Sequence, residues 1–183
     1  MKKKLFFGYI LLICLLISSC ATNSENIRYR VLDCPVEIRE GAVSYAYKYA
    51  ERESEFAWGG RDSLEKEGVL ALDCSGFVVR VFQYAVKGTK YSLLFEDAPV
   101  SGFYYHFTVS IDDALSPGDI IFMGTDKDLP PTHMSIFVGM DDENIYFIDA
   151  TEKEEDGING VTYRYYPKDD PRFLSYARLL IKY

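Results

Sequence analysis

The sequence predicts an α+β fold, in which helices come first and an antiparallel β-sheet follows. Helical periodicity covers residues 37–54 and resumes at Cys74. Beyond Pro117-Gly118 the pattern changes to short runs rich in aromatic and β-branched residues, separated by turn residues, which is typical of strands. Helices followed by consecutive strands indicate the α+β class. The expected strands are residues 119–123, 133–140, 144–150, 161–166 and 175–182.

Each expected helix has its own sequence signals. Apolar side chains recur at helical spacing over residues 37–54, so this helix is amphipathic, and Trp58-Gly59-Gly60 interrupts the pattern. The second helix starts at Cys74, because Asp73 is a good N-cap residue. Gly88 is its expected end.

The rest of the chain fits one domain. Residues 61–72 are expected to form a charged loop, and residues 89–116 are rich in Tyr and Phe but have no clear period. The sequence contains no internal repeat and no low-complexity segment. Its length and apolar content therefore predict a single packed domain over residues 37–183.

The N-terminus resembles a bacterial lipoprotein signal. A cluster of three lysines (residues 2–4) precedes the apolar run of residues 5–17 and then Ser18-Ser19-Cys20. The resemblance implies a signal peptide over residues 1–19 and a lipidated Cys20 that begins a tether over residues 20–36. It also implies a cell-envelope location, with acyl chains holding the protein to the extracytoplasmic face of a membrane. An ordinary signal peptide or an uncleaved anchor helix is the alternative.

The charge of the chain limits its partners. The formal net charge is −8, and removing residues 1–19, which hold three lysines and no acid, makes it −11. The sequence has no basic stripe, so nucleic acid is not an expected partner. Repulsion from anionic lipid indicates that the lipid anchor, and not the surface of the domain, holds the membrane. The protein is expected to be a monomer.

Two of the four cysteines belong to the folded domain. Cys14 lies in the signal and Cys20 is the lipidation candidate, which leaves Cys34 and Cys74. Cysteines outside the cytosol can pair, so a disulfide between residues 34 and 74 is one possibility. Their different contexts favour free thiols, because Cys34 lies in an irregular Asp-Cys-Pro stretch whereas Cys74 opens a helix.

The position of Cys74 favours a reactive thiolate. Unpaired backbone N–H groups and the positive end of the helix dipole stabilise negative charge in the first helical turn. Phe77 and Val78, three and four residues on, turn Cys74 toward the packed face. Gly76 leaves room for a backbone or a substrate to approach closely. For a single isolated cysteine, a buried residue without a chemical role is the alternative.

His133 and Asp149 are candidates for the base and its partner. The chain has two histidines, and His106 is expected to line a surface or the wall of the cleft. In a hairpin that turns at residues 141–143, His133 and Asp149 lie opposite each other, about 5 Å apart. The carboxylate would orient the imidazole and stabilise its charged form, so Cys74, His133 and Asp149 could form an acyl-transfer triad. A structural pair of strand residues is the alternative.

Several motifs occur in an order that resembles the NlpC-type family of cell-wall cysteine peptidases. This family has a papain-like fold, and the resemblance covers roughly residues 40–183. The block around Cys74 is its most specific part. The motifs are Trp58-Gly59-Gly60, Asp73-Cys74-Ser75-Gly76-Phe77-Val78, Pro117-Gly118-Asp119-Ile120-Ile121-Phe122, His133-Met134-Ser135-Ile136-Phe137-Val138-Gly139 and Phe147-Ile148-Asp149-Ala150.

The resemblance implies a role for each matched residue. The family's nucleophile falls on Cys74, its general base on His133 and its orienting residue on Asp149. Family members cleave stem-peptide amides of peptidoglycan, typically between the side-chain carboxyl of D-glutamate and the diamino acid. In some members the residues flanking the cysteine, here Asp73 and Ser75, hold the free amine of the substrate. Asp73 could also act as a helix cap, and Ser75 could be an ordinary first-turn serine.

Two residues depart from the family pattern. The third position usually holds His, Asn or Gln, whereas this chain has Asp149, and a carboxylate should orient an imidazolium at least as well. The family usually has Tyr two residues before Trp-Gly-Gly, where this chain has Phe56. The missing hydroxyl removes one hydrogen bond to the oxyanion or the substrate.

The sequence predicts no metal ion and no other cofactor, because it lacks His-Glu-His spacing and a Cys-x-x-Cys pair. Two other functions remain open. One is a lipoprotein that binds wall peptides without turnover. The other is a papain-like acyltransferase or amidase that acts on a different substrate.

Overall fold

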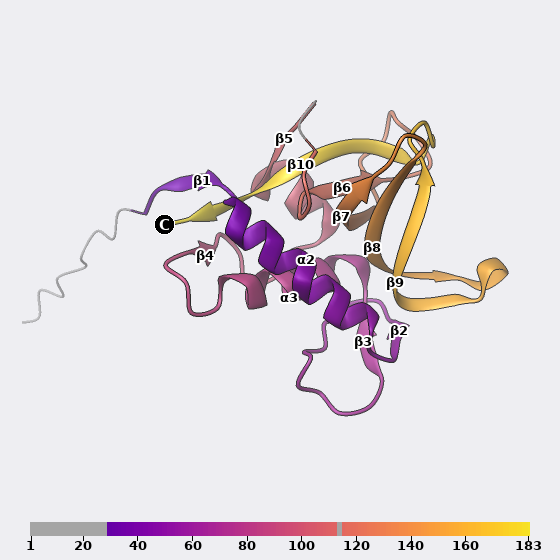
Figure 1. Ribbon diagram of the computed structural model, residues 1–183, viewed down its shortest axis with the longest axis horizontal. Helices are drawn as coiled ribbons and strands as arrows, with labels where there is room; N and C mark the ends of the chain where they lie inside the picture. The colour runs from indigo at the N-terminus through magenta and orange to yellow at the C-terminus, as the bar shows by residue number, and fades with distance from the viewer. Residues whose placement is uncertain (1–28, 113–114) are drawn as a thin grey trace, which may run out of the picture.

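The computed structural model describes residues 29–112 and 115–183, and these residues adopt the expected α+β fold (Figure 1). The helices α2 (Val36–Ala50) and α3 (Cys74–Val86) pack against each other and against an antiparallel sheet. No helix within these two ranges is long and apolar enough to cross a membrane. The expected signal peptide and Cys20 lie outside the described residues, so the lipid anchor stays a prediction.

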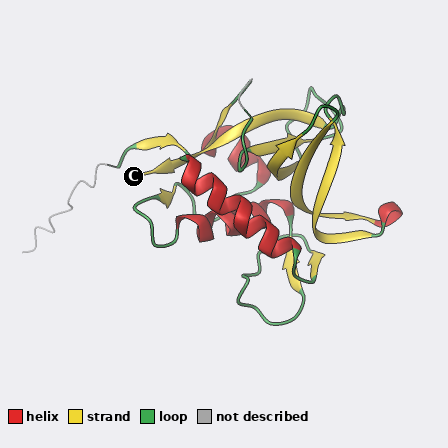
Figure 2. Ribbon diagram, in the orientation of Figure 1, coloured by secondary structure: helices red, strands yellow, loops and turns green. Residues whose placement is uncertain are grey.

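All five strands expected in the second half are present. The hairpin of β8 and β9 is longer than expected and closes through the short 3-10 helix η2 (Glu154–Asp156). Figure 2 shows η2 as the small red helix at the tip of this hairpin. The strands are β6 (Ile120–Met123), β7 (His133–Met140), β8 (Asn144–Lys153), β9 (Ile158–Pro167) and β10 (Phe173–Lys182).

Within the described residues, the main sheet runs in the order β1-β10-β6-β7-β8-β9. The short strands β4 (Ser92–Leu93) and β5 (Thr108–Ser110) also pair with β10. Strand β1 (Val31–Asp33) lies within the expected tether of residues 20–36, so the tether prediction is wrong for these three residues. They are held by backbone pairing to β10, which polar composition alone does not reveal.

A small parallel sheet occupies part of the expected loop over residues 61–72. Helix α2 ends at Ala50, four residues before its expected end, and β2 (Ser54–Phe56) follows it. Strand β3 (Leu70–Leu72) pairs with β2 in parallel. Leu70 and Leu72 are fully buried. The loop prediction is therefore wrong for these three residues, because core burial outweighs the charged sequence before them.

The segment without a clear period contains a π-helix. Helix α4 (Val100–Gly102) leads directly into η1 (Phe103–Phe107), in which each turn holds more residues than an α-helical turn. The wider spacing explains why a 3.6-residue pattern is missing from residues 103–107. Phe103 and Phe107 pack around Phe95, with ring centroids 4.8 and 5.0 Å from it.

The sheet carries a hydrophobic core on each face. Successive residues of a strand point to opposite faces. One face packs with α2 and α3 and includes Ile120, Phe122, Met134, Ile136, Ile148 and Ala150. The other face forms a second core, made by Ile121, Met123, Phe137, Ile145 and Phe147. His133 and Asp149 alternate in step with this second set, and His133 stands at the start of β7, where its ring reaches Cys74 at the N-terminus of α3.

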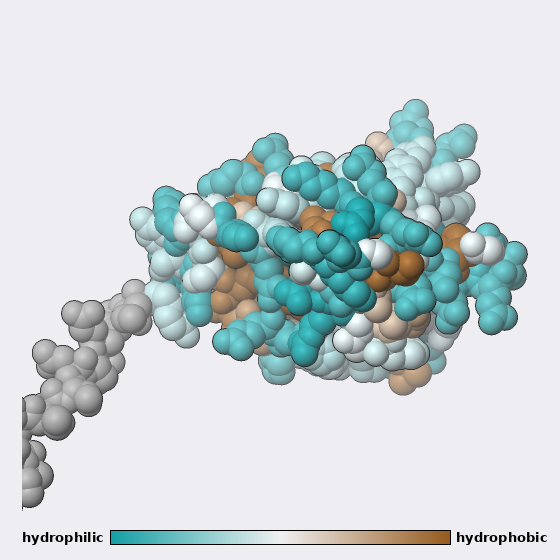
Figure 3. Space-filling view, turned by 90° about the horizontal axis from the view of Figure 1, so that it is seen from below, coloured by the Kyte–Doolittle hydropathy of each residue, from teal (hydrophilic) through white to brown (hydrophobic). Residues whose placement is uncertain are grey.

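The surface agrees with the acidic composition. In Figure 3, hydrophilic residues cover most of the face in view, and hydrophobic residues show in separate areas between them. Scattered apolar side chains of this kind are normal for a folded domain.

Asp119, in the Pro117-Gly118-Asp119 motif, is the centre of a buried ion cluster. Its fully buried carboxylate accepts hydrogen bonds from Nε and Nη2 of Arg178, both at 2.8 Å. Arg39 of α2 lies 3.5 Å away. Gly118 has a φ of 86°, and a Cβ there would lie 2.5 Å from the carbonyl oxygen of Arg39. The motif therefore joins β6 to β10 and α2.

We expect the substitution Asp119→Ala to lower the free energy of unfolding by about 3–5 kcal/mol, because it leaves two arginines in the cluster without their carboxylate. Urea denaturation measures the change. Asp169→Ala, at an exposed turn position, is the control and should change stability by less than about 0.5 kcal/mol. Equal midpoints for the two variants would contradict this account.

Candidate active site

Cys74 lies at the N-terminus of α3, as expected. Asp73 is the N-cap, and its Oδ1 accepts a hydrogen bond from the backbone N–H of Gly76 at 2.6 Å. The Cys74 side chain is almost fully buried among core residues. Cys34 and Cys74 are both free thiols, so the alternative of a disulfide between them is wrong. Burial raises the pKa of the Cys34 thiol to about 12, which makes that cysteine unreactive at neutral pH.

The carboxylate of Asp73 also fixes the loop beside Cys74. Its Oδ2 accepts a hydrogen bond from the backbone N–H of Gly59 at 2.8 Å, and its Oδ1 accepts one from the Ser75 hydroxyl at 3.0 Å. A Cβ on Gly76 would lie 2.1 Å from the carbonyl oxygen of Gly60. The expected close approach at Gly76 is therefore made by backbone, and the Trp58-Gly59-Gly60 and Asp73-Cys74-Ser75-Gly76 motifs form one unit.

His133, the first residue of β7, contacts both other members of the expected triad. Its Nε2 lies 2.6 Å from Oδ2 of Asp149, and its ring also hydrogen-bonds Cys74. Because Nε2 faces the carboxylate, Nδ1 is the nitrogen left for the thiol. Burial lowers the pKa of His133, but the hydrogen bonds and charges of Asp149 and Cys74 outweigh it and raise the pKa to about 10. The imidazole is therefore protonated at neutral pH.

Asp149 is fully buried and has a second cationic partner, Arg164 on β9. The Nε of Arg164 donates to Oδ1 of Asp149 at 3.0 Å, and its Nη2 donates to Oδ2. The Nη1 of Arg164 donates to the hydroxyl of Tyr166 at 2.6 Å. Burial raises the pKa of Asp149, but the bonds and charges of His133 and Arg164 outweigh it, so the pKa lies below its usual range.

Arg164 is a residue of the site that the sequence pattern does not predict. It stands between two tyrosines in β9, at the edge of the main sheet, and an arginine in that setting usually faces solvent. Its side chain is 8% exposed. A buried carboxylate needs a cationic partner, but the sequence does not indicate which of the ten positions of β9 holds it.

The pairing of His133 with Asp149 differs from the expected one. Strands β7 and β8 pair Ile136 with Ile148, and continuing this register places His133 opposite Thr151. Asp149 is therefore the diagonal neighbour of His133 and not its direct partner. The expected register is wrong by two residues, which leaves both side chains on the same face because side chains alternate with a period of two.

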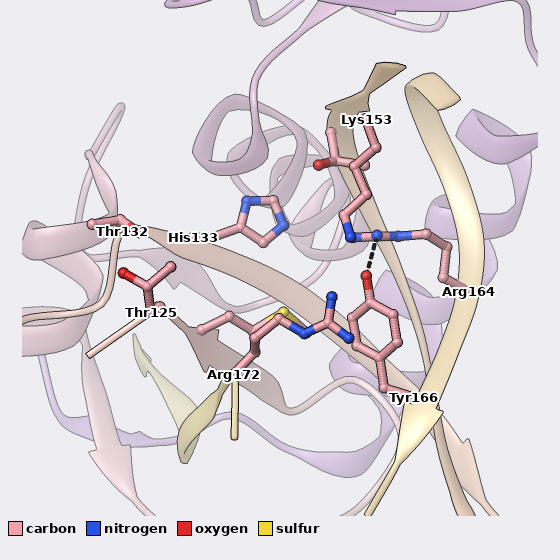
Figure 4. A pocket seen from close by; sticks show the side chains of 10 residues that line it. Thr125, Thr132, His133, Lys153, Arg164, Tyr166 and Arg172 are labelled. Carbon is pink, nitrogen blue, oxygen red and sulfur yellow. Dashed lines mark hydrogen bonds between the residues drawn. The ribbon is translucent and has the colours of Figure 1, made fainter. Parts of the chain in front are cut away.

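Two pockets lie beside the cysteine and the histidine. The cysteine-side pocket, of about 210 Å³, is lined by Asp73, Ser75, Arg61 and Asp97 with Gly59, Gly60, Gly76, Ala98 and Pro99. The histidine-side pocket, of about 170 Å³, is lined by Thr125, Thr132, His133, Thr151, Lys153, Arg164, Tyr166 and Arg172 with Met123 and Gly124. Figure 4 shows His133 at the edge of the second pocket, between the two threonines of residues 125 and 132 and the basic side chains.

His106 and Phe56 are the two other residues that the sequence singles out. His106 is exposed on η1, as expected of a surface residue. The ring of Phe56 packs edge-on against Trp58, with centroids 5.4 Å apart, and Trp58 is 87% exposed. In residues 29–112 and 115–183, no group of three His, Cys, Asp or Glu side chains is arranged to hold a metal ion.

Solved structures share this fold. NlpC1 and NlpC2 from Trichomonas vaginalis are each 19% identical, with TM-scores of 0.53 and 0.54. They match 80% of this chain and 46% and 48% of their own. A protein from Staphylococcus aureus, described as similar to a lipoprotein of the NLP/P60 family, is 18% identical, with a TM-score of 0.51. The match covers 90% of this chain and 47% of that protein.

The chain thus spans a little under half the length of these relatives, and at such identities the likeness concerns the fold alone. Comparison with curated proteins gave no match. The model of the NlpC/P60 family, whose members are generally cysteine peptidases or hydrolases, matches residues 53–170. That is more than half of the chain, and it includes the motifs around Cys74, His133 and Asp149. The chain therefore belongs to the NlpC/P60 family.

Proposed function

We propose that this protein is a cysteine peptidase that hydrolyses amide bonds in peptidoglycan stem peptides, between the side-chain carboxyl of D-glutamate and the diamino acid. The observation that carries the proposal is the contact of Cys74, at a helix N-terminus, with His133, whose Nε2 lies 2.6 Å from the carboxylate of Asp149. This arrangement has the parts that thiol acyl transfer needs. Membership of the NlpC/P60 family supports the choice of substrate class.

In the first half of the reaction, the thiolate of Cys74 attacks the carbonyl carbon of the amide. The backbone N–H groups of the first turn of α3, including that of Cys74, stabilise the negative oxygen that forms. The C–N bond then breaks, and His133 gives its proton to the leaving amine. The substrate's acyl group remains bound to sulfur as a thioester.

In the second half, water replaces the leaving amine. His133, now neutral, accepts a proton from the water molecule as its oxygen attacks the thioester carbon. The C–S bond breaks, the acid product leaves and the thiolate of Cys74 returns. Asp149 stabilises the imidazolium in both halves, since its carboxylate lies 2.6 Å from Nε2.

The cysteine-side pocket is the proposed site for the free amine of the substrate. Asp73 and Asp97 bring two carboxylates to its lining, and Ser75 brings a hydroxyl. Asp97 forms an ion pair with Arg61 and Asp73 already accepts three hydrogen bonds, so the attraction for an ammonium group is mainly electrostatic. Asp73 thus acts as helix cap and as part of the pocket.

The proposed location follows from the N-terminus. We propose that residues 1–19 are removed as a signal peptide and that Cys20 carries the lipid. The peptidase domain of residues 37–183 is then preceded by β1, which pairs with its strand β10. The lipid would hold the domain at the cell envelope, beside its substrate.

A digest of defined stem peptides tests the proposed reaction. We expect the wild-type chain to release the diamino acid from peptides with a free N-terminal amine, and to act at least about tenfold more slowly when that amine is acetylated. The substitution Cys74→Ala should reduce cleavage by roughly 10³-fold or more, because the nucleophile is lost. Mass analysis of the products locates the cleaved bond.

The substitution Cys34→Ala is the matched control, because Cys34 is also a buried free thiol. It should retain most of the activity, and iodoacetamide at neutral pH should label Cys74 before Cys34. Intact peptides after long incubation would refute the peptidase and favour a protein that binds wall peptides without turnover. Consumption of a lipid ester instead would favour an acyltransferase.

The pH profile of cleavage tests the role of Asp149. The imidazolium of His133 exists below its pKa, so kcat/KM should fall as the pH rises toward about 10. The substitution Asp149→Asn removes a charge and weakens the hydrogen bond that raises this pKa. We expect the alkaline limb to move about one to two pH units lower. An unchanged limb would show that Asp149 does not act on His133.

The double substitution Asp149→Asn with Arg164→Met separates the two charges. In the single variant, Arg164 remains buried beside the imidazolium and repels it, which lowers the pKa of His133 further. We expect the double variant to recover part of the shift in the alkaline limb and to be more stable than Asp149→Asn alone. Equal profiles for the two variants would contradict a charge effect of Arg164.

A further inference from the structure

We propose that the histidine-side pocket binds a carboxylate carried by the residue that leaves with the amine. The inference rests on the proposed function and adds a second recognition site to it. The ligand class is an amino acid or short peptide that bears a free carboxylate near its reacting nitrogen, such as a dicarboxylic diamino acid.

The chemistry decides which side of the cleavage point this pocket serves. The nucleophile bonds to the acyl carbon, whereas the general acid must reach the leaving nitrogen. His133 is the proposed general acid, and it lines this pocket, whereas the residues that flank Cys74 line the other one. The leaving residue therefore lies on the side of the histidine-side pocket.

The residues that line the histidine-side pocket include hydrogen-bond donors but no Asp or Glu. Its charged residues are Lys153, Arg164, Arg172 and the protonated His133. Arg164 is engaged with Asp149 and Tyr166. Within the described residues, the Nζ of Lys153 has no hydrogen-bond partner, since its nearest carboxylate, that of Asp156, lies 3.9 Å away and is 54% exposed.

Arg172 brings further hydrogen-bond donors to the histidine-side pocket. Arg172 binds Asp170 through Nε and Nη2, at 2.8 and 2.6 Å, and its guanidinium lies 3.6 Å from the centre of the Tyr166 ring. Its Nη1 has no partner among the residues that the structure describes. Figure 4 shows Arg172 and Lys153 on the same side of the pocket as Tyr166, with Thr125 and Thr132 across from them. A carboxylate would accept from such donors, whereas an ammonium would be repelled.

The size of the pocket supports one residue of a longer substrate. Its volume of about 170 Å³ is below the range of about 300–1,000 Å³ in which proteins enclose whole small-molecule ligands. The two pockets also differ in charge, because carboxylates line the cysteine side and cations line the histidine side. Together they fit a short peptide with an amine at one end and a carboxylate at the other.

Binding to the full chain with Cys74→Ala tests the proposal without turnover. The probes are the stem tripeptide that ends in diaminopimelate with free carboxylates and the same peptide with both of these carboxylates amidated. Calorimetry should give about tenfold tighter binding for the free acid, as expected for a charge-assisted hydrogen bond. Adding Lys153→Met should remove this difference, and adding Lys153→Glu should reverse it.

Lys90→Met is the control, because Lys90 does not line the histidine-side pocket. Its Nζ lies over the ring of Tyr183, the last residue of the sequence, 4.6 Å from the ring centre. This variant should keep the tenfold preference. Equal affinity for both peptides, or a preference that survives Lys153→Met, would overturn the carboxylate site. Cleavage of both peptides by the wild-type chain without a preference would do so too, and would leave the proposed function standing. Preferential binding without cleavage would refute the peptidase and support the pocket.

Discussion

A negative charge that water cannot reach governs the arrangement around the active site. The carboxylate of Asp149 is fully buried, and an isolated charge there would cost several kcal/mol. His133 and Arg164 replace the water from two sides and fix the imidazole and the guanidinium at the same time. The Asp149–Arg164 pair is formally neutral, as are Asn, Gln and an uncharged His, the residues that this position usually holds in the family. The departure from the family pattern therefore comes with its own compensation.

Local sequence signals predicted the cysteine half of the site. The N-cap of Asp73, the start of α3 at Cys74 and the close approach at Gly76 each depend on residues within one helical turn, and the structure has all three. The α+β class and the five strands after Pro117 were predicted for the same reason, because their periods are local. These features need no knowledge of which strand lies next to which.

The features that the sequence did not reveal depend on distant partners. Strand β1 exists because β10 pairs with it, and β3 exists because its leucines are buried against the core. The π-helix η1 has a period that the usual templates do not include. Arg164 is buried only because Asp149 lies on the neighbouring strand. For β1, β3 and Arg164, the local pattern favours exposure or irregularity, and tertiary contact outweighs it.

The pairing of β7 with β8 shifts by one residue at Val138, which has no partner across the hairpin. Near the turn, Gly139 pairs with Tyr146, and without the shift His133 would fall opposite Glu152. The ring would then share a face with Glu152 and Ala150, and the carboxylate of Asp149 would point the other way. One extra residue in a strand thus decides whether base and acid can meet. Over evolutionary time, this hairpin can gain or lose residues at its turn freely. Between residue 133 and the turn it can gain or lose only an even number of residues, because an odd number would turn the His133 ring to the other face.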